Sequence, residues 1–343
     1  MGKIMVTIKE VAKRAGVSIA TVSRVINDVD NVGDNYKQAA LKAIAELDYR
    51  PNAVARSMKS RRFKTIGVII SDFSVPFFEK IIKKIEDEFC KKGHLLLFVN
   101  TYDNPEIEKA GIYFMIEKQT DVLLICSTGE NEDYLKRFQQ KGLQIIFFDR
   151  RPKHHKFPMV YVNKREGMYR TIDYLSKKGH QKIVLISGPR QVSSNYDRYM
   201  GITDYLYDHE LTWRGSISYY FGAFSEQYGY SMMKELVCNG NHPTAIVTGG
   251  SIIATGVFLY CRENNLRIPE DISLVSFGDF SSGKLIYPRL TYINDEHEKL
   301  SNHLIKLIQL AFNKELNDIE IIIPSQLCVY DSVIEISKTK IDE

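Results

Sequence analysis

The chain of 343 residues lacks the features that would place it in a membrane or outside the cell. No hydrophobic run approaches the roughly 18 residues of a membrane-spanning helix, and the N-terminus has no secretion-type hydrophobic stretch. The five cysteines are far apart, odd in number and without a C-x-x-C pair. We therefore expect a cytoplasmic protein with no membrane partner, whose thiols are free and buried.

Metal-binding and catalytic motifs are also missing. The eight histidines are scattered except for His154-His155, which we expect in a solvated loop, so no metal site is predicted. The sequence contains no G-x-G-x-x-G, no G-x-x-x-x-G-K-[ST] and no G-x-S-x-G motif. We assign no catalytic residue and no cofactor, and we do not expect an enzyme. Turnover of a ligand by the purified protein would reverse that expectation.

Positive charge is concentrated in one part of the chain. Residues 1–65 contain 13 lysines and arginines against 6 acidic residues, whereas the remaining residues contain 33 against 36. The two regions carry formal net charges of +7 and −3, which give the +4 of the whole chain. A basic head on a nearly neutral body is typical of proteins that bind nucleic acid phosphates.

Residues 7–27, TIKEVAKRAGVSIATVSRVIN, have the pattern of a helix-turn-helix. Thr7 and Glu10 can form a capping box at the start of the first helix, and Gly16 can end it. Ser18 can cap the second helix. The short turn allows the second helix to enter the major groove of DNA by its N-terminal end. We therefore expect double-stranded DNA to be a partner.

Two further segments complete the head. A third helix is expected from residue 34 to about residue 47. Its inward-facing residues are expected to be Ala40, Leu41, Ile44 and Leu47. Pro51 then interrupts regular structure, and Asn52 can cap a short helix over residues 53–59. Because this segment is shorter than the ~12 residues that an isolated helix needs in water, we expect it to fold on binding DNA.

From residue 65 onward, hydrophobic strand-like runs alternate with amphipathic helices. The expected strands are 66–70, 95–100, 122–126, 145–148, 160–162, 183–187, 216–220, 245–248 and 273–276. The helices expected between them include 77–92, 106–118, 134–141, 166–178 and 198–209. This alternation predicts an α/β fold with parallel sheets, and its strands fit two doubly wound lobes better than one sheet. A ligand would bind at the carboxyl ends of the strands, between the lobes.

The sequence resembles the LacI/GalR family of bacterial transcription repressors over nearly its whole length. The resemblance rests on the helix-turn-helix, on YRPNAVARSMKS, and on KTIGVII, PFF, FFDR, RIPEDISLVSFGD and PRLT in that order. It implies a repressor of a carbohydrate-utilisation operon with a body like a periplasmic sugar-binding protein. The implied parts are a three-helix head at 1–50, a hinge helix and linker at 51–64, and a body at 65–343. The lobes of the body would be about 65–162 with 294–324, and about 163–293 with 325–343.

The resemblance places Ile19, Ala20 and Arg24 at the positions that contact bases. Arg24 can donate two hydrogen bonds to guanine, and Ile19 and Ala20 can contact a thymine methyl group. Ile19 could instead pack in the core, and Thr7 and Ser18 could act only as caps. The other residues placed at the DNA are Thr7, Ser18, Thr21, Ser23, Asn27, Tyr36, Asn52, Ala55, Arg56, Met58 and Lys59. Tyr36 stands where the family usually has threonine.

The resemblance also implies that a hinge helix from each subunit of a homodimer enters the minor groove. Met58 replaces the leucine that usually wedges between base pairs there, and a solvated basic linker is the alternative. A pseudo-palindromic operator has two half-sites, so a homodimer is expected, and a tetramer stays open. Residues 77–89 and 252–260 are candidates for the dimer surface or, equally, for the core.

A small carbohydrate-like effector is implied in the cleft. The effector-binding candidates are Asp72, Phe77, Asp149, Arg150, Asn163, Arg198, Phe224, Gly250 and Asp279. Asp149 and Arg150 could instead form a local ion pair. Phe224 could be a core residue rather than a platform for a sugar ring, for which Tyr220 is a second candidate.

Several polar side chains of the family are missing from this site. The replacements are Val75 for Asn, Asn163 for Asp, Gly250-Ser251 for an Asn-Asp pair, and Gly278 for Asp. They predict an unusual effector, either larger or acidic, or else control by a protein corepressor as in the catabolite-control branch of the family. Closure of the lobes on a ligand is expected to change the separation of the hinge helices, whether the ligand induces or corepresses.

Overall fold

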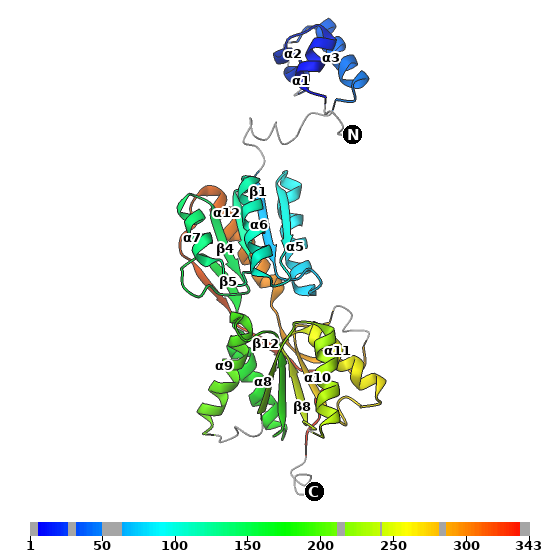
Figure 1. Cartoon of the computed structure of the whole chain (residues 1–343), viewed down its shortest axis with the longest axis vertical. Coiled ribbons are helices and arrows are strands. Elements are labelled where there is room, and N and C mark those ends of the chain that lie inside the picture. The colour runs from blue at the N-terminus through cyan, green and yellow to red at the C-terminus, as the bar shows by residue number, and fades with distance from the viewer. Residues whose placement is uncertain are drawn as a thin grey trace. The chain divides into compact units, whose positions relative to one another are not determined.

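The computed structural model describes residues 6–26, 32–49, 64–210, 217–240, 242–280 and 286–336. Internal contacts divide the chain into two compact units, Met1–Phe63 and Lys64–Glu343. Each unit has hydrophobic cores of its own. Figure 1 labels the helices and strands.

The N-terminal unit is a head of three helices, α1 (Ile8–Ala15), α2 (Ile19–Ile26) and α3 (Asp34–Glu46). Its core is small, with two buried residues from each helix. These are Val11, Ala12, Val22, Val25, Ala40 and Ala43. The prediction that Leu41 faces inward is wrong, because its side chain is 49% exposed. Successive residues of a helix lie about 100° apart, so Leu41 points away from the face that Ala40 and Ala43 bury.

The predicted helix ends in the head are confirmed. The Glu10 carboxylate accepts a hydrogen bond from the Thr7 backbone N–H at 2.6 Å, and the reciprocal bond of the capping box is also present. Gly16 ends α1 in the left-handed region, at φ 68° and ψ 27°. Ser18 Oγ accepts from the Thr21 backbone N–H at 3.0 Å and so caps α2. These caps fix the tight turn between α1 and α2.

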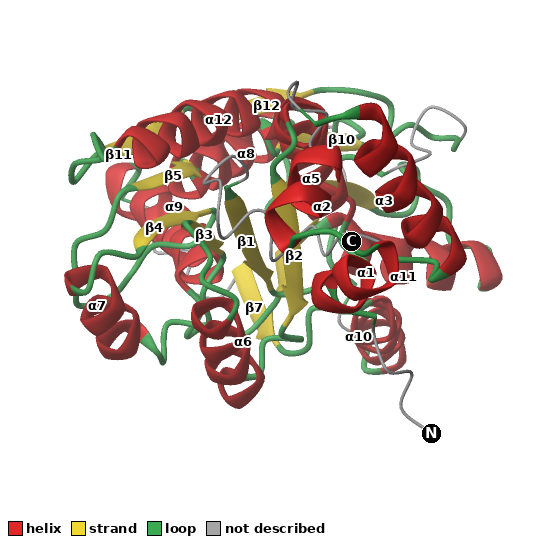
Figure 2. Cartoon of the chain, turned by 90° about the horizontal axis from the view of Figure 1, so that it is seen from above, coloured by secondary structure: helices red, strands yellow, loops and turns green. Residues whose placement is uncertain are grey.

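The first lobe of the body is a six-stranded, fully parallel sheet in the order β11-β5-β4-β3-β1-β2. Its strands are β1 (Thr65–Ile70), β2 (Leu95–Asn100), β3 (Val122–Ile125), β4 (Gln144–Phe148), β5 (Met159–Val162) and β11 (Glu320–Ile323). One face packs against α5 (Pro76–Phe89) and α12 (His297–Asn313), and the other against α6 (Pro105–Glu117) and α7 (Glu132–Gln140). Figure 2 shows these helices on both sides of the strands. A short 3₁₀ helix, η1 (Cys90–Lys92), extends α5.

The second lobe repeats this plan in the order β12-β10-β9-β8-β6-β7. Its strands are β6 (Ile183–Ser187), β7 (Ile217–Phe221), β8 (Ala245–Thr248), β9 (Ser273–Phe277), β10 (Thr291–Asn294) and β12 (Gln326–Cys328). All neighbours are parallel except β12, which is antiparallel to β10. Helices α8 (Lys164–Lys177) and α9 (Ser193–Asp208) cover one face, and α10 (Glu226–Cys238) and α11 (Ser251–Glu263) the other.

The predicted fold of two doubly wound α/β lobes is confirmed. Each expected strand is present with ends that differ by at most one residue where they are described. Strands β10, β11 and β12, which contain 4, 4 and 3 residues, were not predicted. The chain passes between the lobes after β5, after β10 and after β11, so three connections join them.

Helices α10 and α11 approach each other closely through two glycines. A Cβ atom at Gly256 would lie 1.9 Å from the carbonyl oxygen of Glu226, and one at Gly229 would lie 2.1 Å from that of Ile253. Backbone atoms cannot give way as a side chain can. The packing of this helix pair therefore depends on the missing side chains.

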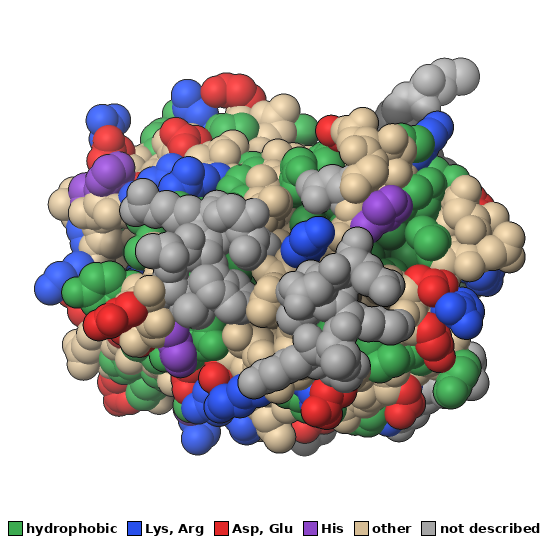
Figure 3. Space-filling model, turned by 90° about the horizontal axis from the view of Figure 1, so that it is seen from below, with side chains coloured by type: hydrophobic (Ala, Val, Ile, Leu, Met, Phe, Trp, Pro, Cys, Tyr) green, Lys and Arg blue, Asp and Glu red, His purple; other side chains and the backbone are tan. Residues whose placement is uncertain are grey.

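Three predictions concern membrane helices, cysteines and surface charge. No helix in the described parts of the chain is long and hydrophobic enough to span a membrane. All five cysteines are free, but the prediction that they are buried is wrong for Cys90 and Cys238, which are exposed. Figure 3 shows basic and acidic side chains interspersed on the face it presents, in keeping with the nearly neutral charge of the body.

Candidate functional site

Helix α2 has a buried face and an exposed face. Val22 and Val25 lie in the core of the head. Ile19 is 44% exposed, and Ala20 and Arg24 are exposed as well. The alternative that Ile19 packs in the core is therefore wrong. The three residues expected at the bases all lie on the exposed surface of α2.

Several other residues expected at the DNA are accounted for by the head itself. Thr7 and Ser18 serve as helix caps, and the Thr21 hydroxyl lies 2.8 Å from that of Ser18. Ser23 is half-buried, and the Tyr36 side chain is 61% exposed at the start of α3. Six residues with an expected DNA contact lie outside the described residues. They are Asn27, Asn52, Ala55, Arg56, Met58 and Lys59.

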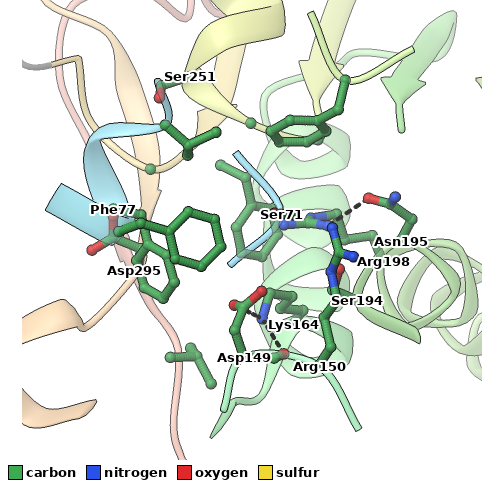
Figure 4. Close-up of a pocket in the computed structure, with 18 of the residues that line it drawn as sticks. Ser71, Phe77, Asp149, Arg150, Lys164, Ser194, Asn195, Arg198, Ser251 and Asp295 are labelled. Carbon is green, nitrogen blue, oxygen red and sulfur yellow. Dashed lines mark hydrogen bonds and ion pairs between the residues drawn. The ribbon is translucent and has the colours of Figure 1, made fainter. Parts of the chain in front are cut away.

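A pocket lies at the carboxyl ends of the strands and is lined by both lobes (Figure 4). Seven of the nine expected effector residues line it, namely Phe77, Asp149, Arg150, Arg198, Phe224, Gly250 and Asp279. The other lining residues are Ser71, Val75, Phe78, Asp103, Val162, Lys164, Ser194, Asn195, Gly249, Ser251, Phe277, Gly278 and Asp295. The structure thus brings together side chains that lie far apart in the sequence.

The other two expected residues, Asp72 and Asn163, lie outside the pocket lining and have structural partners, as does Tyr220, the second candidate for the ring platform. Asp72 accepts a hydrogen bond from the Ser74 backbone N–H at 2.9 Å, in the turn before α5. Asn163 caps α8 by accepting from the Glu166 backbone N–H at 3.1 Å. Tyr220 packs against the core beside α10 and α11. A contact of these residues with an effector stays a prediction.

Two ion pairs stand at the first-lobe side of the pocket. The Arg150 guanidinium donates to both carboxylate oxygens of Asp103, at 2.5 and 3.1 Å. The Lys164 ammonium lies 2.7 Å from Asp149 Oδ1 and also donates to the Asp149 carbonyl at 3.1 Å. Asp149 and Arg150 thus each form an ion pair at the end of β4, with Lys164 and Asp103 as the partners.

Asp149 is held in an unusual position. It follows β4 with φ 63°, in the left-handed region, and its side chain is 14% exposed. Burial opposes the charged form, but the charge and hydrogen bond of Lys164, with the charges of Arg150 and Arg198, hold the pKa of Asp149 below its usual value. The carboxylate is therefore ionised at neutral pH. Because Lys164 begins α8, this pair joins the two lobes beside a connection.

Arg198 is a buried cation with a different set of partners. Its guanidinium donates to Asn195 Oδ1 at 2.7 Å and lies 4.4 Å from the centre of the Phe277 ring. Asn195 is itself fixed, because its amide donates to the Pro189 carbonyl at 3.0 Å. The Nε atom of Arg198 is buried without a hydrogen-bond partner. Burial lowers the pKa of Arg198 to about 10, which leaves it charged at neutral pH.

Aromatic rings form much of the remaining wall. Phe77 and Phe78 come from the first lobe, with ring centres 5.2 Å apart. Phe224 comes from the second lobe, and a Cβ atom at Gly250 would lie 2.2 Å from its ring. Gly250 is thus needed for the ring to lie where it does. This answers the open question on Phe224: the ring packs partly against the core and also lines the pocket.

The residues missed by sequence reasoning follow a simple rule. Asp103 comes shortly after β2, Lys164 after β5, and Ser194 after β6. These are carboxyl ends of parallel strands, where the fold concentrates binding residues. No group of three or more His, Cys, Asp or Glu within the described ranges could hold a metal ion. The arrangement suits the binding of a small polar molecule between two lobes.

Comparison with known families agrees with both parts of the chain. Residues 7–52 match the model of bacterial regulatory proteins of the lacI family. Residues 63–329 match the model of periplasmic binding proteins and the sugar binding domain of the LacI family.

Individual relatives extend over almost the whole chain. The transcriptional repressor PurR of Pectobacterium atrosepticum is 31% identical over 93% of this chain and 94% of its own length. The transcriptional regulator RegA of Clostridium saccharobutylicum is 31% identical over 96% and 99%. The crystal structure of the Lac repressor bound to ONPG in the repressed state has a TM-score of 0.76 at 25% identity, covering 96% of this chain and 99% of that one. The chain therefore belongs to the LacI family, as a DNA-binding transcriptional repressor whose body is the sugar-binding domain of that family.

Proposed function

We propose that this repressor binds a pseudo-palindromic operator as a homodimer and that a small molecule in the pocket controls this binding. The observation that carries the DNA part is the exposed surface of α2, with Ile19, Ala20 and Arg24 outside the core. Ser18 and Thr21 at the N-terminal end of α2 add polar groups beside it. An arginine among small and hydrophobic neighbours can bind guanine and exclude other bases.

The control part rests on how the pocket is assembled. Its walls come from both lobes, and ion pairs at its edge also join them. Besides the pair of Lys164 and Asp149, Arg151 after β4 pairs with Asp197 of α9, and its backbone N–H donates to Ser193 Oγ at 2.9 Å. A ligand that fits one relative position of the lobes better than another shifts the population toward that position.

Lys64, the last residue of the linker from the head, is held against the body. The Lys64 ammonium donates to the Phe312 carbonyl and lies 4.6 Å from the centre of the Phe312 ring. Phe312 is near the end of α12, and Asp295 of the pocket stands just before that helix. A helix of 17 residues thus connects the pocket wall with Lys64 at the end of the linker. We infer that α12 passes a change at the pocket to the linker.

The DNA part is tested by selecting bound sequences from a random pool with the full chain and repeating the selection with Arg24→Ala. We expect the variant to lose preference at one base pair per half-site, which corresponds to about 1–3 kcal/mol of discrimination. Arg14→Ala is the matched control, because Arg14 lies on α1 and pairs with Glu46 at 2.6 Å. Unchanged preference in Arg24→Ala would remove Arg24 from base recognition.

Three finer points remain predictions from the family resemblance. A carbohydrate effector and a carbohydrate-utilisation operon are expected on that ground, as is the homodimer, which sedimentation of the free and operator-bound protein would measure. Control by a protein corepressor is the alternative from the missing polar side chains. The buried cations and aromatic rings of the pocket favour the small molecule.

A further inference from the structure

The chemistry of the pocket differs between its two sides. Figure 4 shows Arg150, Arg198 and Asn195 on the side opposite Phe77 and Asp295. Cations and their partners therefore gather at one end of the space. A ligand that fits this arrangement has one polar end and one hydrophobic end.

The cations at the polar end are not equivalent. Arg150 is neutralised by Asp103 and Lys164 by Asp149. Arg198 has no carboxylate within 4.0 Å among the residues that the structure describes, and this absence of an ion pair separates it from Arg150, since the Nε atoms of both arginines are buried without a hydrogen-bond partner. Burial opposes the charge of Arg198, and the charges of Asp149 and Asp197 only partly offset that effect. An anionic group in direct contact with the Arg198 guanidinium would therefore be stabilised there.

The rest of the pocket wall combines the rings of Phe77 and Phe224 and the bare backbone of Gly250 with a few polar side chains, namely Ser251, Asp279 and Asp295. The Phe224 ring occupies the space that any side chain at Gly250 would need. It also excludes one at Gly188, where a Cβ atom would lie 2.9 Å from the ring. A flat hydrophobic group can pack between Phe77 and Phe224, whereas the hydroxyl groups of a sugar would lose hydrogen bonds to water against these rings.

We propose that the effector is an amphipathic acid, a compact molecule with a flat hydrophobic ring and one carboxylate. The carboxylate binds Arg198 and the ring lies between Phe77 and Phe224. This proposal rests on the proposed function of the pocket as the effector site, and it replaces the expected carbohydrate with a different ligand class. Asp295, on the side of Phe77, disfavours a second negative charge at the far end of the ligand.

Four probes separate ring type from charge in calorimetric titrations of the full chain. Benzoate has the aromatic ring and the carboxylate, benzyl alcohol only the ring, D-glucuronate only the charge, and D-glucose neither. Each is titrated to about 20 mM, because small ligands of this size bind with dissociation constants on the order of 1 mM. We expect benzoate to bind at least about tenfold more tightly than each of the other three.

Variants show whether benzoate occupies the proposed place. Arg198→Gln is expected to weaken benzoate binding at least about tenfold while leaving benzyl alcohol unchanged, and Phe224→Ala to weaken both. Arg190→Gln is the matched control, since Arg190 is exposed and lies over Tyr199 outside the pocket lining. Thermal unfolding of each variant checks that it is folded.

Three results would overturn the proposal. They are tighter binding of D-glucuronate or D-glucose than of benzoate, equal effects of Arg198→Gln and Arg190→Gln, and no binding of any probe. Operator binding is measured in the same preparations by gel shift. A protein that binds operator but fails these titrations keeps its function as a repressor and loses the amphipathic effector. A protein that binds benzoate but shifts no operator fails at the proposed function instead.

Discussion

The two lobes of the body have the same strand order but different chemistry at the strand ends. When the first five strands of each lobe are numbered along the chain, β1 to β5 and β6 to β10, both sheets have the order 5-4-3-1-2. Each sheet also gains one strand from the C-terminal part of the chain, β11 or β12, beside its fifth strand. The first lobe ends its strands in charged side chains, Asp103 and Asp149 among them. The second lobe also has carboxylates at this edge, Asp279 after β9 and Asp295 after β10, but it adds glycines and the Phe224 ring.

The difference teaches that the fold fixes where a ligand binds and leaves open which ligand binds. Both sheets bring the carboxyl ends of parallel strands to one edge, so both contribute to the pocket. The side chains that follow each strand are free to vary because the hydrophobic faces of the strands hold the lobe together. The lobes also differ in how their helices pack, and that difference can be tested first.

The largest effect is expected from Gly256→Ala in the second lobe. The new Cβ atom would lie 1.9 Å from a backbone oxygen of α10, so the helix pair must separate. We expect a loss of about 3 kcal/mol or more in the free energy of unfolding, measured with denaturant. The control is Gly111→Ala in the first lobe, where the Cβ atom would lie 2.7 Å from Val99 Cγ1, a side-chain methyl group and not a backbone atom. Equal losses would show that the second lobe is no more tightly packed at its glycines.

A smaller effect is expected from Glu108→Gln in the first lobe. The buried carboxylate of Glu108 accepts from Thr128 backbone N–H at 2.6 Å, Thr128 Oγ1 at 3.0 Å, Asn131 Nδ2 at 2.9 Å and Ser127 Oγ at 3.2 Å. An amide replaces one acceptor with a donor that faces other donors. We expect a loss of about 2 kcal/mol in the free energy of unfolding.

Glu117→Gln, on the exposed end of the same helix, is the control for Glu108→Gln and should cost much less. The Ser127 carbonyl accepts a hydrogen bond from Arg150 at 3.4 Å, so Glu108 also supports the charged wall of the pocket. If Glu108→Gln unfolds like the wild type, the four hydrogen bonds do not stabilise this loop.

The sequence predicted features that depend on neighbouring residues and missed contacts between residues far apart in the chain. Alternating hydrophobic runs located the long strands, and the motif around Arg24 located the exposed helix, because both depend on neighbours in the chain. Strand β12 was missed because its three residues, Gln326, Leu327 and Cys328, contain no continuous hydrophobic run. The partner of Arg150 was missed because Asp103 is 47 residues away and follows another strand.

The role of Phe224 also depends on a residue far away in the sequence. The sequence identified it as either a core residue or a ring platform, but the choice depends on Gly250, which is brought against it by the fold. A glycine in the sequence indicates only that a side chain is missing. The structure is needed to show which neighbour fills the space.

The smallest effect is expected from a fall in pH, which should reduce the stability of the second lobe more than that of the first. His180 in the second lobe is fully buried, its Nε2 donates to the Ile334 carbonyl at 3.0 Å, and burial lowers its pKa. The unfolded chain binds the proton at higher pH than the folded lobe does. The stability from neutral His180 is therefore complete above the usual pKa of about 6.5 and is lost as the pH falls below it.

His94 in the first lobe also has a pKa lowered by burial, and then by the charge of Lys64, but it is only half-buried. We expect acidification from pH 7.5 to 5.5 to reduce amide protection more in β6 than in β1, by on the order of 1 kcal/mol, measured by hydrogen exchange. His180→Asn should remove most of that difference and His94→Asn little of it. An equal pH dependence of β6 in wild type and His180→Asn would assign the effect to other groups, since a neutral asparagine cannot take up the proton.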